Sequence, residues 1–188
     1  MTSMTFLRSG IVCAAAAALA MQPGLAAAQD CLAEDEVSAM AIYAMPGVVQ
    51  GVRLRCASKL QPSGFLARSG DAVSARYGRL QGAAWPKAKS GLLKIAESKA
   101  ASSPRGARLG GADSLKMIST LPDNAVRPLV DALIVQEVAP QIDLKHCGKF
   151  ELLIQTLSKI EPEVAGTLLG LVAGLVKLDE PSICGVRA

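Results

Sequence analysis

Apolar side chains recur every three or four residues along most of the chain, a spacing that places them on one face of a helix. The clearest example is the stretch 123–139, whose expected buried face consists of Val126, Leu129, Val130, Leu133, Ile134 and Val138. A second is the stretch 150–160. Alternation of apolar and polar residues, which is typical of strands, is almost absent. We therefore predict an all-α fold, a compact bundle of about six to eight helices.

Acidic residues, caps and prolines indicate where the other helices begin. Three acids at positions 34–36 fall in the first turn of a helix expected over residues 33–45, where the helix dipole favours negative charge. Pro46 either kinks this helix or begins a second one that ends near Cys56. Further helices are expected over residues 63–68, 113–120 and 162–178, and from Asp71 and Trp85 onward.

Glycines and turn formers separate these helices. Gly70 is expected to close the helix over residues 63–68. Residues 98–111 have no apolar period and are rich in turn formers, which predicts an exposed loop. The helix over residues 162–178 is apolar on most sides, which predicts a place at the centre of the bundle. Tight packing against a neighbouring helix is expected at its equally spaced glycines, Gly166, Gly170 and Gly174.

Residues 1–28 have the pattern of a secretory signal peptide. Arg8 precedes an apolar stretch over residues 11–20, and three alanines end at Ala28 as an expected cleavage site. This stretch is well short of the roughly 20 residues that span a bilayer, so we expect no transmembrane anchor in the mature form. We expect a single helical domain over residues 29–188, periplasmic in or secreted from a bacterium. Cleavage after Ala20 is the alternative.

Cleavage after Ala28 would leave four of the five cysteines, an even number that predicts two disulfides in an exported protein. Three pairings are open. Cys31 and Cys56 bracket the first two expected helices, and Cys147 and Cys184 bracket the last two. If each pair of helices forms a hairpin, its ends meet, so we predict two helical hairpins, each closed by a disulfide: Cys31 with Cys56, and Cys147 with Cys184.

Charge is unevenly distributed along the chain, whose formal net charge is +4. Residues 53–108 carry twelve Lys and Arg against two acids, whereas the flanking stretches of the mature chain carry an excess of acids. This asymmetry indicates an acidic partner, pairing between the middle and the two ends, or solvated helix faces. The candidate ligand-binding residues are Arg76, Tyr77, Arg79, Trp85, Lys87 and Lys89, although Tyr77 and Trp85 are alternatively anchors of the core.

The residue inventory argues against common catalytic sites. The only histidine, His146, lies beside Cys147, and these two ligands fall short of the four that structural zinc requires. Neither expected disulfide has the Cys-x-x-Cys spacing of a thiol oxidoreductase, and no nucleophile has an obvious base. We therefore expect a non-enzymatic protein without a metal or cofactor.

Two functions remain. The first is an exported helical module that binds an anionic envelope component or a partner protein through its basic middle segment, with nucleic acid excluded because an exported protein rarely meets it. The alternative is a carrier of an apolar ligand or lipid, held in a cavity of the bundle lined by residues such as Val130, Leu133, Ile134, Leu153 and Leu157.

Overall fold

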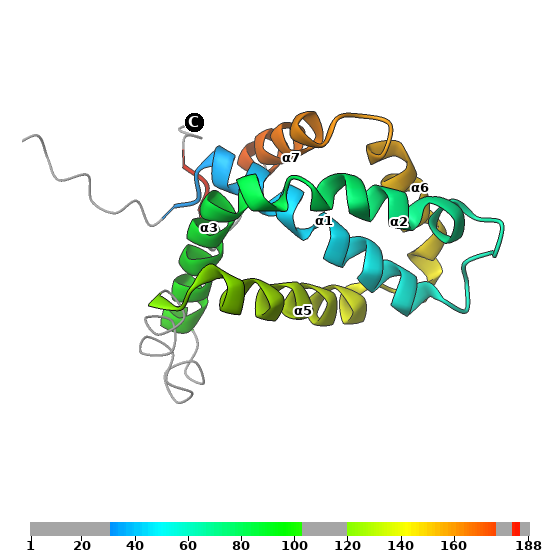
Figure 1. The fold of residues 1–188 in the computed structure, drawn as a ribbon, viewed down its shortest axis with the longest axis horizontal. Helices are drawn as coiled ribbons and strands as arrows, with labels where there is room; N and C mark the ends of the chain where they lie inside the picture. The colour runs from blue at the N-terminus through cyan, green and yellow to red at the C-terminus, as the bar shows by residue number, and fades with distance from the viewer. Residues whose placement is uncertain (1–30, 103–119, 176–181, 185–188) are drawn as a thin grey trace, which may run out of the picture.

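The computed structural model describes residues 31–102, 120–175 and 182–184 (Figure 1). The signal-peptide prediction lies outside these residues. The described part of the chain forms a short 3-10 helix at Leu144–His146 and six α-helices: α1 (Glu34–Cys56), α2 (Phe65–Gly78), α3 (Gln81–Ser102), α5 (Asp123–Gln141), α6 (Cys147–Leu157) and α7 (Pro162–Leu175). Its one pairing of β type is an isolated bridge between Leu32 and Ile183. The predicted all-α fold is therefore confirmed.

Helix α1 lies at the centre of the bundle. Helices α2, α3, α5 and α7 all pack against it, and α6 touches it as well. Figure 1 shows α1 running diagonally through the molecule, with α7 above it and α5 below. Tyr43, Val49 and Val52 of α1 are almost fully buried. Among the described helices α1 alone is long and apolar enough to cross a membrane, but the bundle surrounds it.

The predicted central position of the last helix is wrong, because α7 packs on α1 with one face only. Glycines form that face: a Cβ on Gly166 would lie 2.9 Å from Ile42, and a Cβ on Gly170 would lie 2.7 Å from the Glu34 carbonyl oxygen. The tight packing predicted for these two glycines is thus confirmed. The larger apolar side chains of α7 remain exposed: Val164, Leu168, Leu169, Leu171 and Val172.

Two residues that commonly end helices, Pro46 and Gly70, lie inside helices that pack against each other. No second helix begins at Pro46, which lies inside α1. Gly70 does not close a helix, because it lies in the middle of α2 against Val49 and Arg53 of α1, where a larger residue would crowd them. Asp71 pairs with Arg53 rather than capping a new helix. The stretch 63–84 accordingly contains one helix, α2, and the start of α3.

The remaining boundaries agree with prediction to within a few residues. Helix α5 ends two residues beyond the expected stretch, and α6 begins three residues before its own. Helix α3 begins before Trp85 and continues to Ser102, so the first part of the predicted loop 98–111 is helical. The rest of that loop, and the predicted helix 113–120 before Thr120, lie outside the described residues.

The four cysteines form two disulfides, but the predicted pairing is wrong. The bonds join Cys31 to Cys184 and Cys56 to Cys147, with Cα–Cα distances of 5.1 and 5.7 Å. Cys31 precedes and Cys56 ends one continuous helix of 23 residues, about 35 Å long, so these two cysteines cannot meet. The hairpin that the prediction required does not exist. Instead, backbone hydrogen bonds of Leu32 to Ser182 and Cys184 bring the described ends of the chain together.

Candidate functional site

Three of the four lysines of α3, Lys87, Lys89 and Lys94, form ion pairs with acids from other helices. Lys87 Nζ lies 2.8 Å from Asp35 at the start of α1, and Lys89 Nζ lies 2.9 Å from Asp123 at the start of α5. The hydrogen bond from Lys87 lowers the pKa of Asp35, so the pair persists in mildly acidic solution.

The candidate arginines of α2 differ from each other. Arg76 donates a hydrogen bond of 2.7 Å to the Ser158 carbonyl and pairs with Glu161 at 2.8 Å, so it ties α2 to the turn after α6. Arg79 is exposed and forms no ion pair with the described residues. Three of the four basic candidates, Arg76, Lys87 and Lys89, therefore pair with acids from the two ends of the chain.

The aromatic candidates are core residues. Tyr77 is 1% exposed and Trp85 3%. The Trp85 ring lies 4.9 Å from that of Tyr43, centroid to centroid, and the Arg127 guanidinium lies 5.8 Å from both centroids. Burial raises the pKa of Tyr43 to about 12, so this phenol stays protonated at neutral pH. The six candidate residues consequently do not form one exposed anion-binding surface.

A larger feature is an apolar cleft of about 530 Å³ between α3 and α5, with α1 as its floor. The two wall helices each pack on α1 but scarcely touch each other, which leaves the space open. Lys89 and Asp123 bridge them. The described lining residues are Ala44 and Val48 of α1; Trp85, Lys89, Leu92, Leu93, Ile95, Ala96 and Lys99 of α3; and Val126, Val130, Leu133, Ile134, Glu137 and Val138 of α5.

The structure brings together part of the apolar set predicted for a ligand carrier. Val130, Leu133 and Ile134 line the cleft. Leu153 and Leu157 do not, because α6 packs at the other end of α1, beside Cys56. The α3 wall was not predicted as part of a ligand site, although the helical spacing of Leu92 and Ile95 indicates an apolar face on this helix.

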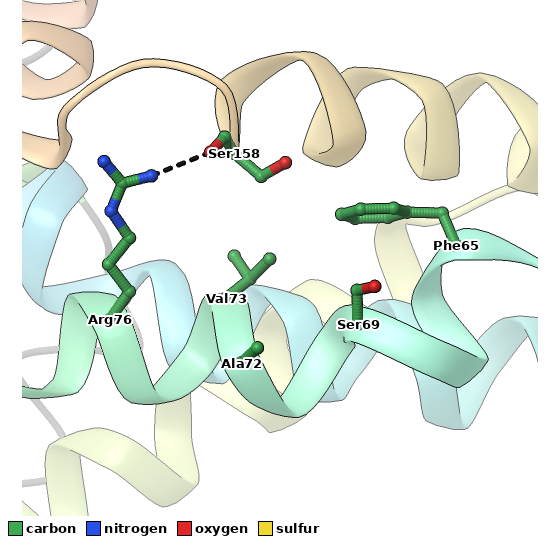
Figure 2. Close-up of a pocket in the computed structure, with 6 residues that line it drawn as sticks. All are labelled: Phe65, Ser69, Ala72, Val73, Arg76 and Ser158. Carbon is green, nitrogen blue, oxygen red and sulfur yellow. Dashed lines mark hydrogen bonds between the residues drawn. The ribbon is translucent and has the colours of Figure 1, made fainter.

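A second, smaller pocket of about 210 Å³ lies between α2 and the turn after α6. Figure 2 shows Phe65 and Arg76 at its two ends, with Ser69, Ala72 and Val73 between them. The hydrogen bond from Arg76 to Ser158 crosses one end. Because Arg76 is already bound to Ser158 and Glu161, this pocket offers a ligand little free charge.

Comparisons with known proteins give no assignment: no family model, no curated protein and no solved structure matches this chain. The candidate site therefore rests on geometry alone, and the cleft of α1, α3 and α5 is the larger of the two pockets described.

Proposed function

We propose that this protein is an exported, non-enzymatic carrier that binds an apolar small molecule in the cleft between α3 and α5. The observation that carries the proposal is the cleft itself. Its volume of about 530 Å³ lies in the range of roughly 300–1,000 Å³ that small-molecule sites occupy. Twelve of its fifteen described lining residues are apolar, so filling it with an apolar ligand removes hydrocarbon surface from water.

The ion pairs support this function over the binding of an anionic partner. Lys87, Lys89 and Arg76 already have carboxylate partners within 3 Å. An anionic ligand would have to displace these carboxylates. Exposed ion pairs of this kind contribute little to the free energy of folding, but each carboxylate still competes with an anionic ligand for its lysine or arginine. The charge asymmetry of the sequence is in this view complementarity within the fold.

The two disulfides support export, since such bonds persist in oxidising compartments and are rare in the cytosol. The signal-peptide pattern of residues 1–28 points the same way. A periplasmic or secreted location would expose the protein to lipids and other apolar molecules of the envelope.

Titration with the uncharged dye N-phenyl-1-naphthylamine tests the proposal. Trp85 lines the cleft and is the chain's only tryptophan, so energy transfer from it to the bound dye reports occupancy of this site. We expect saturable binding of one dye molecule to the oxidised protein. Ala96→Phe, which places a ring in the cleft, is expected to weaken binding about tenfold or more, equivalent to 1.4 kcal/mol.

Ala83→Phe is the matched control, because Ala83 lies on the same helix but is exposed and outside the cleft. It is expected to bind the dye like the unchanged protein. Absence of saturable binding, or equal affinities of the two variants with unchanged melting temperatures, would refute the carrier function.

A further inference from the structure

Seven of the ten large apolar side chains that the described part of the chain exposes lie on α6 and α7. They are Leu152 and Leu153 of α6 and the five exposed residues of α7 named above. We propose that the outward surfaces of these two helices, here called the α6–α7 face, bind the surface of a membrane that contains anionic lipids. This proposal is independent of the carrier function, because no described residue of α6 or α7 lines the cleft between α3 and α5.

The two helices lie on the same side of α1. Gly166 of α7 lies against Ser38 in the first half of α1. At the other end of α1, Cys147 of α6 is bonded to Cys56. Ser38 and Cys56 are 18 residues apart, which is about five helical turns, so they point to the same side of α1. Figure 1 shows α7, and the turn that joins it to α6, on the side of α1 away from α5.

On each helix the exposed apolar side chains lie opposite the packed ones. Leu168 is two residues from both Gly166 and Gly170, the glycines that face α1, and this spacing places it on the outward side of α7. On α6, Ile154 is buried whereas Leu152 is 62% exposed. The apolar stretch Pro162–Ala173 is too short to span a bilayer, so in a membrane this helix would lie within the interface.

The free charges beside these leucines are lysines. Lys149 is exposed one turn before Leu153, and Lys159 is exposed in the turn that follows α6. Neither lysine forms an ion pair with the described residues. The one acid of α6, Glu151, points toward α2, where it accepts a hydrogen bond of 2.9 Å from the Leu66 N–H. Exposed leucines beside unpaired lysines are typical of helices that lie on anionic membranes.

The acids of the last helix and of the turn before it do not cancel this charge. Glu161 pairs with Arg76 of α2 at 2.8 Å. Glu163 precedes Gly170 by seven residues, about two turns, so it lies toward the packed side of α7. Residues 164–172, which supply the outward apolar row, contain no acid. The α6–α7 face is therefore apolar and positively charged.

This composition favours lipid over protein as the partner. Protein interfaces are enriched in Tyr, Trp and Arg and depleted of Lys, whereas the α6–α7 face exposes Leu, Val and Lys. A second copy would bring Lys149 and Lys159 against the same two lysines, because a two-fold contact pairs a surface with itself. A bilayer supplies an apolar layer for the leucines and valines and negative headgroups for the lysines.

Co-sedimentation of the oxidised protein with lipid vesicles tests the proposal. We expect binding to phosphatidylcholine vesicles that also contain phosphatidylglycerol, weakened by high salt, and much weaker binding to phosphatidylcholine alone. Lys149→Gln with Lys159→Gln should weaken binding to the anionic vesicles about 25-fold, because each lysine near such a surface is worth about fivefold in affinity. Arg79→Gln with Lys99→Gln is the matched control, since both residues are exposed and unpaired elsewhere on the described fold, and it should bind more tightly than the first pair.

The leucines are tested in the same way. Leu153→Gln with Leu168→Gln should weaken binding to the anionic vesicles about tenfold or more, because less hydrocarbon then leaves water. Leu54→Gln with Leu129→Gln is the matched control on α1 and α5 and should leave binding unchanged. These four leucines are 49–61% exposed, so both paired variants should melt close to the unchanged protein.

Leu168→Trp gives a readout at the face itself. Brominated lipid should quench the fluorescence of this variant on anionic vesicles and leave that of Leu129→Trp almost unchanged, since Trp85 is buried in both. Equal quenching of the two variants, or vesicle binding that survives both the lysine and the leucine pair of substitutions, overturns the proposal. So does absence of vesicle binding, including the case in which sedimentation equilibrium finds a dimer that Leu153→Gln with Leu168→Gln dissociates, because the face would then bind protein.

Discussion

At the scale of single residues, Glu36 is the most heavily bonded charge in the described part of the fold. It is 7% exposed, and its carboxylate accepts hydrogen bonds from Lys94 Nζ at 2.8 Å, Ser90 Oγ at 2.6 Å and the Ala33 N–H at 2.9 Å. Lys94 in turn donates to the Cys31 carbonyl. One side chain therefore joins α1, α3 and the backbone beside the Cys31–Cys184 disulfide. Burial opposes its ionisation, but these hydrogen bonds outweigh burial and lower the pKa of Glu36.

Glu36→Gln should accordingly destabilise the protein by about 2 kcal/mol, because it leaves Lys94 and Ser90 without their charged acceptor in a partly buried place. Urea denaturation measures this change. Glu34→Gln is the matched control, since Glu34 is exposed in the same helical turn, and it should change stability by less than about 0.5 kcal/mol.

The same contact predicts a pH dependence. Because the pKa of Glu36 is lower in the folded chain than its ordinary value of 4.5, the carboxylate stabilises the fold fully above that value and loses its contribution as the pH falls through the folded pKa. The difference in melting temperature between the unchanged protein and Glu36→Gln should therefore be constant near neutral pH and shrink below about pH 4.5. A difference that grows on acidification would contradict the role of this carboxylate.

At the scale of helices, the spacing of apolar residues predicted the helix bounds correctly where a helix has one continuous apolar face. The bounds of α5 follow from a continuous apolar face, and the sequence indicated them to within two residues at its C-terminal end. The helix boundaries predicted at Pro46 and Gly70 were wrong, because proline and glycine end a helix only when no packing energy offsets their local cost. Both lie in helices that pack along one another at the centre of the bundle, where burial of Val49 and Leu66 outweighs the local cost.

The packing of α7 on α1 has a direct test. Gly170→Ala should destabilise the protein by about 2 kcal/mol, since the new Cβ would lie 2.7 Å from the Glu34 carbonyl oxygen and a backbone must shift. Gly82→Ala is the control with identical chemistry: no atom lies within 4 Å of a Cβ built there, so it should stabilise α3 by about 0.5–1 kcal/mol. Thermal unfolding compares the two. Equal effects would mean that α7 does not approach α1 this closely.

At the scale of the whole molecule, the disulfide pairing and the position of the cleft depend on contacts between distant segments, which a local sequence pattern does not show. The cleft has one wall, α5, with a clear apolar face, and this half of the site was predicted through Val130, Leu133 and Ile134. The spacing of Leu92 and Ile95 signals an apolar face on the other wall, α3. The open space between the walls depends on α3 and α5 diverging after both pack on α1, which no local pattern encodes. The charge asymmetry did signal long-range pairing, since acids at both ends of the chain meet bases in its middle. It could not say which acid meets which base.

The disulfide pairing is the strongest whole-molecule test, because it distinguishes a continuous α1 from a hairpin. Peptide mapping of the unreduced protein should find the pairs Cys31–Cys184 and Cys56–Cys147. The first closes a loop of 153 residues, so in the loop-entropy account it restricts the unfolded chain strongly, and replacing both its cysteines with alanine should cost about 3–5 kcal/mol. The variant should remain helical by circular dichroism, since α1 keeps α2, α3 and α5 around it. Recovery of Cys31–Cys56 instead would require α1 to break near Pro46, and the cleft floor formed by Ala44 and Val48 would break with it.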